Sequence, residues 1–248
     1  MPIPENAPKG PESADGRFAL TRWSVVLAAG GDDPAARRAL EILCINYWYP
    51  LYAFVRRQGH QPHDAQDLTQ EFFAKLLEKG WLDGVAREKG KFRSFLLASM
   101  KHFLSNERDR ARAQKRGGGR SPISLDTHSA ESRYAMEPVD IATPEKIFDR
   151  RWALTLLEQV LARLRAEMAS RGNAALFDEL KASLCGQPSP YGQIAAKLDM
   201  SEGAVKVAAH RLRQRYRELI REEVAQTVGS EGDVDDELRE LMSALSSR

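Results

Sequence analysis

The chain has 248 residues, of which 42% are hydrophobic and 29% charged, and its formal net charge at pH 7 is +2. This composition allows a packed core in one large domain or two small ones. It excludes membrane insertion, because no apolar run approaches the length of a membrane span, and residues 1–16 lack the apolar core of a signal peptide. The only two cysteines, Cys44 and Cys185, lie in apolar stretches and are typical of reduced thiols, so we expect a cytoplasmic protein.

The pattern of residues 17–116 is helical almost throughout. Residues 1–16 are rich in proline and acidic residues, and we expect them to be disordered. Apolar spacing predicts a short helix around 18–26, a second from about 33 to 59 that Pro50 interrupts or kinks, a third over about 62–78, and a fourth from about 90. Gly117, Gly118 and Gly119 end the fourth helix, since three glycines cannot continue a helix cheaply.

A segment of different composition follows. Residues 117–146 are rich in glycine, serine and proline and contain few large apolar side chains, so we expect a flexible, extended linker. Helical spacing returns over 147–228, and residues 229–248 form an acidic amphipathic tail. Strand-like alternation is absent. The sequence therefore predicts an all-α fold with two small helical domains joined by a flexible linker.

Charge is unevenly distributed along these segments. Residues 101–120 carry seven basic and two acidic side chains, and residues 206–221 carry six basic and one acidic. The tail, residues 229–248, carries six acidic and two basic side chains. Two separated basic patches with an acidic tail indicate contact with nucleic acid at two places.

The second basic patch belongs to a predicted helix-turn-helix. Ser201 stands where the N-cap of its second helix is expected, and residues 199–201 give a turn of suitable length after a shorter helix over 190–198. One face of the second helix is apolar, and a neighbouring face is basic. Such a helix can lie in a DNA major groove, although a solvated basic face on a core helix has the same pattern. The apolar stripe consists of Val205, Ala208, Ala209, Leu212, Tyr216 and Leu219.

The third helix carries acidic residues on one face. Asp64, Asp67 and Glu71 recur at spacings of three and four, so they stack along the helix. Acidic residues near the start of a helix favour its dipole, which is a sufficient structural explanation for the first two. An acidic docking face for a basic partner is the functional alternative, and spacing alone does not separate the two.

Together these motifs resemble a known family. Asp64-Ala-Gln-Asp-Leu-Thr-Gln-Glu-Phe-Phe73 resembles the core-binding helix of bacterial RNA polymerase sigma factors of the extracytoplasmic-function type. Residues 191–219 are similar to the C-terminal helix-turn-helix of the same family, and the order of the two motifs matches. The resemblance covers residues 17–116 and 147–225. It implies a sigma factor that directs the polymerase to promoters and assists promoter opening, without enzymatic activity or a cofactor of its own.

The resemblance also assigns roles to residues. The acidic helix would dock on the clamp helices of the largest subunit of core RNA polymerase, through Asp64, Asp67, Gln70 and Glu71. The fourth helix would contact the melted minus-ten strand of promoter DNA through Arg93, Lys101, His102, Ser105, Asn106 and Arg110. The helix-turn-helix would bind the minus-thirty-five duplex through Ser201, Glu202, Gly203, Lys206, His210, Arg211 and Arg213.

The sequence departs from the family pattern in three places. Gln66 stands where a glutamate is common, His102 replaces a common asparagine, and Val207 and Ala208 replace polar and arginine side chains. The missing negative charge beside Asp67 suggests a switch in which a Ser/Thr kinase phosphorylates Thr69 and restores charge. A threonine hydroxyl bonded back to a carbonyl is the structural alternative. An anti-sigma factor is another candidate regulator, and the acidic tail could fold onto a basic domain and compete with DNA.

Two other classes of protein remain. A metal-dependent phosphohydrolase could use His60, His63, Asp64, Asp67 and Glu71, but the sequence offers no second His-Asp set, so we expect no metal site. An independent helix-turn-helix regulator would bind a palindrome as a dimer, without acting as a polymerase subunit. Binding to core RNA polymerase separates this alternative from a sigma factor.

Overall fold

The computed structural model describes residues 34–77, 91–113, 127–135, 143–187 and 189–246, and all of the regular structure in these ranges is helical. The all-α prediction is confirmed. The helix predicted around 18–26 lies outside the described residues, as do the side chains of both cysteines. No described helix is long and apolar enough to cross a membrane.

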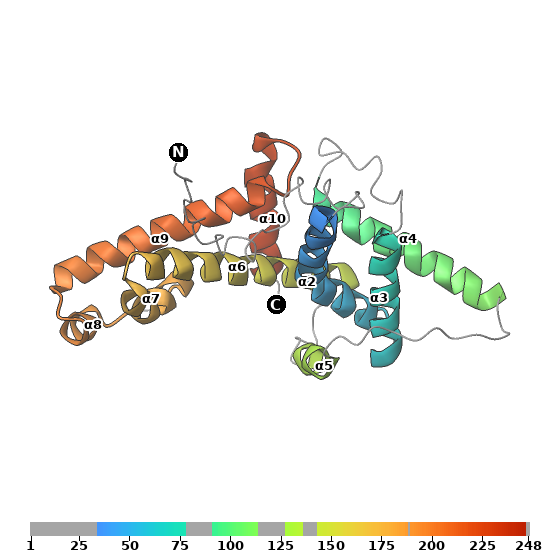
Figure 1. Ribbon diagram of the computed structural model, residues 1–248, viewed down its shortest axis with the longest axis horizontal. Helices are drawn as coiled ribbons and strands as arrows, with labels where there is room; N and C mark the ends of the chain where they lie inside the picture. The colour runs from blue at the N-terminus through green and yellow to red at the C-terminus, as the bar shows by residue number, and fades with distance from the viewer. Residues whose placement is uncertain (1–33, 78–90, 114–126, 136–142, 188, 247–248) are drawn as a thin grey trace, which may run out of the picture.

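The N-terminal helices follow the predicted order. They are α2 (Pro34–Arg57), α3 (Pro62–Leu77) and α4 (Phe92–Ala113), as Figure 1 shows. Pro50 lies inside α2 without ending it, so of the two predicted effects, an interruption or a kink, the interruption does not occur. The five residues that follow, 51–55, are all buried. Helix α2 therefore lies at the centre of this half of the molecule, with α3 packed beside it.

The long helix α6 (Pro144–Ser170) joins the two halves of the molecule. Its start lies inside the predicted linker, because the Thr143 hydroxyl accepts a hydrogen bond from the Lys146 amide and Pro144 occupies the first turn. Across the interface, the Trp152 ring stacks on the Tyr47 ring of α2, with ring centroids 4.1 Å apart. The buried side chains of the two predicted domains thus form one continuous core.

The predicted linker is also helical in part. Residues Thr127–Ala135 form α5, which lies against α2. Glu131 accepts hydrogen bonds from Tyr52 (2.5 Å) and from Arg56 (2.7 Å), and the Arg133 guanidinium lies 4.0 Å from the centre of the Tyr49 ring. The prediction of a wholly flexible, extended linker is therefore wrong for 127–135 and for the start of α6.

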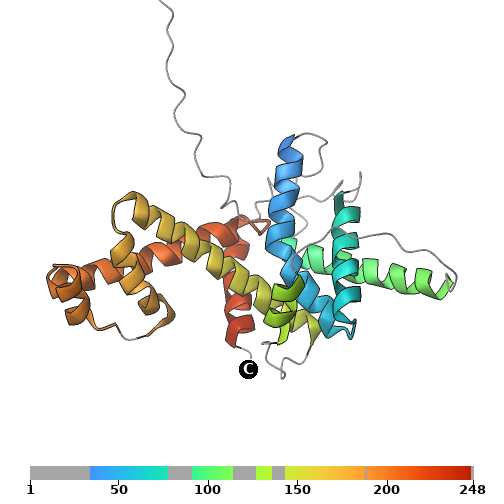
Figure 2. The same cartoon turned by 60° about the horizontal axis from the view of Figure 1, so that its bottom comes forward.

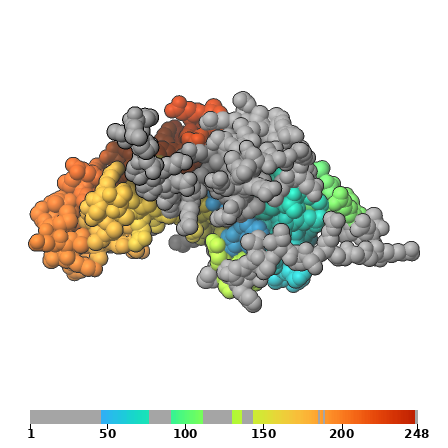
Figure 3. All heavy atoms as spheres, in the orientation of Figure 1, coloured from blue at the N-terminus to red at the C-terminus, as the bar shows by residue number. Residues whose placement is uncertain are grey.

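The C-terminal half carries the predicted helix-turn-helix and the tail. Helix α7 (Ala174–Leu180), the short helix η3 (Lys181–Cys185) and α8 (Tyr191–Lys197) lead into the long helix α9 (Glu202–Ala225). After η4 (Glu231–Asp233), α10 (Val234–Ser246) folds back on α6 and α9. Figures 1 and 2 show an elongated molecule with α8 and the start of α9 at one end and the C-terminal part of α4 at the other. In Figure 3 the orange residues of the helix-turn-helix form the left-hand end.

The contact between Tyr47 and Trp152 generates a prediction about stability. Trp152 is 2% exposed, so Trp152→Ala removes most of a fully buried ring from the interface between α2 and α6. We expect the free energy of unfolding to fall by about 3–5 kcal/mol, measured by urea denaturation. The exposed Glu158→Ala on the same helix is the control and should stay within about 0.5 kcal/mol of wild type. Equal effects of the two changes would contradict a shared core.

Candidate nucleic-acid interface and docking face

Two helices joined by a short turn, α8 and α9, stand where the sequence predicts a helix-turn-helix. Ile194 and Ala195 of α8 are buried. The turn after α8 bends through Asp199, whose φ of 52° is left-handed, and the Met200 amide donates to the Ala195 carbonyl (2.9 Å). The Ser201 hydroxyl then caps α9 by accepting a hydrogen bond from the Ala204 amide (3.2 Å). These contacts fix the angle at which α9 leaves α8.

Helix α9 turns one face to the core and the other to solvent. Val205, Ala209, Leu212 and Leu219 are buried, and Ala208 and Tyr216 are half-buried, so the predicted apolar stripe is confirmed. The predicted DNA contacts Glu202, Gly203, Lys206, His210 and Arg211 are all exposed. They lie along the first three turns of α9, and the Glu202 carboxylate lies near Gly192 of α8.

Two predicted contacts in the helix-turn-helix have structural roles. Ser201 is exposed, but its hydroxyl is used by the helix cap. Arg213 is half-buried, and its Nε donates to the Ala209 carbonyl (3.2 Å). The predicted DNA contacts left out two exposed side chains on the outer face, Val207, which is 50% exposed, and Arg217. Both continue the helical spacing of Gly203 and His210, and this spacing could have identified them.

The basic residues of α9 form two groups, those that are held in ion pairs and those that are not. Arg215 binds Glu167 of α6 (2.9 Å), which raises the pKa of the guanidinium and joins the two helices. Lys206 pairs with the neighbouring Glu202 (2.7 Å), and this contact raises the pKa of the amine. Within the described part of the chain, no ion pair engages Arg211 or Arg217. Their charges therefore remain available to an anionic partner.

The acidic face of α3 is present but partly neutralised. Asp64 and Glu71 are exposed, and Asp67 is half-exposed. Asp67 lies 3.1 Å from the His63 ring, and Glu71 pairs with Lys75 (2.8 Å), which also binds Glu107 of α4 (2.7 Å). The carboxylate of Asp64 has no ion pair among the described residues. A partner would meet a face of modest negative charge.

Two predictions on α3 need correction. The amide oxygen and nitrogen of Gln70 are both buried, so this side chain offers no polar group to a partner. Thr69 is 0% exposed, and its hydroxyl donates to the Ala65 carbonyl (2.6 Å), which is the structural alternative raised by the sequence. A kinase cannot reach this hydroxyl while α3 is folded, so the folded structure does not support Thr69 as a phosphosite.

Five of the six predicted single-strand contacts on α4 are exposed, and two of these five are held in ion pairs. Lys101, His102, Ser105, Asn106 and Arg110 are exposed along the C-terminal two thirds of the helix. Neighbouring carboxylates engage both cations, because Lys101 pairs with Glu145 (2.7 Å) and Arg110 with Glu107 (2.8 Å). This face is polar, accessible and close to neutral.

Arg93 is a clear correction. Its side chain is only 8% exposed and lies in an ion cluster with Asp149, Glu237 and Glu240. Desolvation lowers the pKa of the guanidinium, but the surrounding carboxylates outweigh this effect and raise it. Arg93 stabilises the contact between α4, α6 and α10, and it cannot reach DNA in this arrangement.

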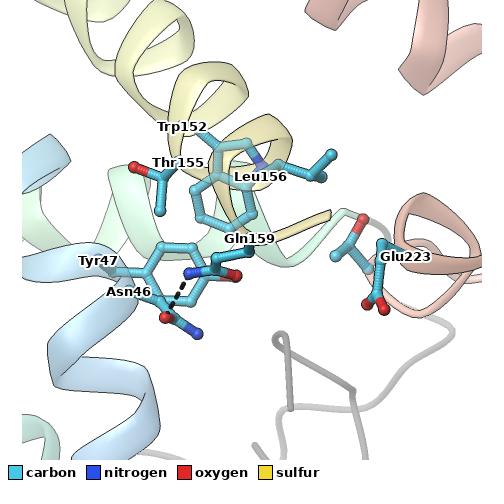
Figure 4. A pocket seen from close by; sticks show the side chains of 8 residues that line it. Asn46, Tyr47, Trp152, Thr155, Leu156, Gln159 and Glu223 are labelled. Carbon is cyan, nitrogen blue, oxygen red and sulfur yellow. Dashed lines mark hydrogen bonds between the residues drawn. The ribbon is translucent and has the colours of Figure 1, made fainter. Parts of the chain in front are cut away.

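Two cavities among the described residues are each too small to hold a substrate. The cavity between α2, α6 and α9, shown in Figure 4, has a volume of about 10 Å³ and room for roughly one water. It is lined by Tyr47, Trp152 and Glu223, and Gln159 donates to Asn46 beside it (2.5 Å). Among the described residues, no three His, Cys, Asp or Glu side chains are grouped to hold a metal ion.

Comparisons of this chain with models of protein families, with curated proteins and with solved structures find no match.

The burial of Thr69 generates a second prediction. Thr69→Asp would place a carboxylate where the hydroxyl now bonds to Ala65, and an unpaired buried charge costs about 3–5 kcal/mol of stability. Thr69→Ser keeps the hydroxyl bond and loses one methyl group, so its cost should be about 1 kcal/mol. Thermal and urea unfolding of both variants check this. Wild-type stability of the Asp variant would show that the position is accessible after all.

Proposed function

We propose that this chain is a promoter-recognition subunit of bacterial RNA polymerase, a sigma factor of the extracytoplasmic-function type, acting in the cytoplasm. The observation that carries the proposal is the unit α8–α9. In this unit the chain bends tightly at Asp199, and the capped helix α9 that follows has an exposed basic face. The acidic face of α3 and the polar face of α4 lie toward the opposite end of the elongated molecule (Figure 1). Such a chain can contact DNA and polymerase with different surfaces.

The geometry of α9 suits duplex DNA. Residues near the start of a recognition helix contact base edges, and basic residues farther along contact phosphates. On the exposed face of α9, the residues near its start are Gly203, Lys206, Val207 and His210. The basic residues farther along this face are Arg211 and Arg217. The apolar side chain of Val207 would contact the methyl group of thymine in the major groove. Binding through the two arginines should weaken with salt as counterions are released.

The other two surfaces have complementary roles in this proposal. Asp64 and Glu71 on α3 would dock against basic residues of the clamp helices of the polymerase. His102, Ser105 and Asn106 on α4 would contact the opened strand, by stacking and hydrogen bonds to bases. Neither role requires a catalytic group, because binding energy at two promoter elements positions the polymerase.

Binding of core RNA polymerase tests the proposal. The purified full chain should capture core enzyme, and the double variant Asp64→Lys, Glu71→Lys should weaken capture by at least about tenfold, because two repulsive contacts replace two attractive ones. Glu158→Lys, an exposed charge reversal on α6, is the control and should bind as wild type. Sequence-specific DNA binding without any capture of core enzyme would favour the independent regulator.

Gly203 provides a prediction in which stability and DNA affinity move in opposite directions. A Cβ at this position would meet nothing within 4 Å in the protein, so internal packing does not require a glycine in the first turn of α9. Gly203→Ala should raise the free energy of unfolding by up to about 1 kcal/mol. It should lower DNA affinity if bases or phosphates approach the backbone closely.

A matched control for Gly203 lies in η4. A Cβ at Gly232 would be 3.7 Å from the Ser230 hydroxyl, an ordinary contact, and η4 follows the C-terminal end of α9, whereas Gly203 lies in its first turn. Gly232→Ala should leave DNA affinity unchanged, as measured by fluorescence anisotropy with a selected duplex in the presence of core RNA polymerase. If Gly203→Ala binds the duplex as tightly as wild type, α9 does not approach DNA with this face.

A further inference from the structure

An exposed apolar side chain lies at the centre of the outer face of α9. Val207 is 50% exposed, and among the described residues it and Met242 are the large apolar side chains left most open to solvent. Val207 does not pack against the hydrophobic core, whereas its neighbour Ala208 does. The valine therefore has no part in holding α9 to the rest of the described structure.

The residues one helical turn before Val207 are small. The same face carries Gly203 and Ala204 there, and both are exposed. A Cβ at Gly203 would meet nothing within 4 Å, so the protein itself does not fill the space in front of this turn. Small residues let a helix approach a ligand closely. The isopropyl group of Val207 can therefore reach a ligand that lies against the start of α9.

Basic residues on both sides of Val207 indicate what kind of ligand this is. Lys206 and His210 lie on one side of the valine, and Arg211 lies on the other, and all three are exposed. An apolar group between basic residues suits the major groove of DNA, where phosphates border a floor of base edges. A membrane surface would require a broad apolar face with several large side chains, which these two turns of α9 do not have.

The floor of the major groove offers one kind of apolar group. The C5-methyl group of a pyrimidine, carried by thymine and by 5-methylcytosine, projects there among the donors and acceptors of the base edges. A valine placed against a carbonyl or amino group would displace its water without replacing the hydrogen bond, which weakens binding. Contact between two apolar groups has no such cost. Val207 therefore favours a methyl group and disfavours a polar base edge at the same position.

We propose that Val207 is a specificity-determining residue that reads a pyrimidine C5-methyl group, whichever base carries it, in the duplex bound by α9. The assignment of this duplex to a promoter rests on the proposed function, whereas the contact between the valine and the methyl group does not. Thymine supplies the methyl group in unmodified DNA. Methylation of a cytosine at the same position would supply it too, so the affinity of this chain would respond to cytosine methylation.

Removal of the methyl group alone tests the proposal. The probe is the duplex selected by the full chain with core RNA polymerase. In the block whose recognition depends on Arg211, each thymine is replaced in turn by deoxyuridine, which keeps the base pair and removes only the C5-methyl group. At one thymine or two adjacent ones, affinity measured by fluorescence anisotropy should fall about fourfold, the effect of leaving one methyl group unburied. Val207→Ala should bind the thymine and deoxyuridine duplexes equally.

A second pair of duplexes distinguishes the two carriers of the methyl group. At the sensitive position the T·A pair is replaced by a C·G pair, with and without a methyl group on C5 of the cytosine. The wild-type chain should bind the methylated duplex about fourfold more tightly, and Val207→Ala should lose this difference. A loss with deoxyuridine but no gain with 5-methylcytosine would overturn reading of the methyl group alone, because the O4 atom of thymine would then be required.

A control variant separates the methyl contact from general effects on DNA affinity. Gln214 is exposed two turns farther along the same face, so Gln214→Ala should keep the response to deoxyuridine whatever its total affinity. Val207 is half exposed, so Val207→Ala should keep the thermal stability of the wild-type chain. Equal responses of the wild-type chain and Val207→Ala at every thymine would overturn the proposal, as would a selected block made of G·C pairs alone.

The outcomes also separate this inference from the proposed function. If the chain selects a duplex without core RNA polymerase, the same substitutions are made in that duplex. A response that depends on Val207 there would retain methyl reading and remove the sigma-factor proposal. Selection only with core enzyme, but without a response that depends on Val207, would retain the sigma factor and overturn methyl reading. Selection of no duplex under either condition would overturn both.

Discussion

The packing of α6 against α2 is the constraint on which the rest of the structure depends. Tyr47 and Trp152 stack at the centre of this interface, with Phe92 and Phe148 around them. Helix α6 has 27 residues and is about 40 Å long, and about 27 Å of it runs from Trp152 toward the α8–α9 unit. The candidate DNA-binding face of α9 and the faces of α3 and α4 are thereby held apart at the two ends of one molecule.

Charge serves two different purposes in this arrangement. Arg93, Arg163 and Arg215 each pair with carboxylates of another helix and hold helices together. Arg211 and Arg217 point outward and have no ion pair among the described residues. A count of basic residues along the sequence does not distinguish the arginines that hold helices together from those that point outward. Only the outward group can supply the electrostatic part of DNA binding, which depends on charges that are free to replace counterions.

The sequence predicted the features that local physics determines. The bounds of α3, the cap at Ser201, the turn at Asp199 and the apolar stripe of α9 all follow from spacing and capping within a few residues. The helix α5 could not be predicted, because it is short and polar and its contacts with α2 come from residues more than 70 positions away.

The errors in the candidate site have the same origin. Helical spacing places Thr69 beside the acidic face, but its burial depends on how α3 packs in the tertiary fold. Arg93 belongs to a basic helix in sequence, yet the carboxylates that surround it include two that are over 140 residues away. Side chains whose surroundings come from distant elements are the ones that a pattern of residues in one helix cannot place.

The central claim is that two surfaces of this chain recognise two DNA elements as part of a polymerase. The most direct test is selection of bound duplexes from a random DNA library by the full chain, with and without core RNA polymerase. A sigma factor should select, only with core enzyme, two unlike sequence blocks at fixed separation, and Arg211→Ala with Arg217→Ala should weaken recognition of one block alone. Selection of one palindrome by the chain without polymerase would contradict the account.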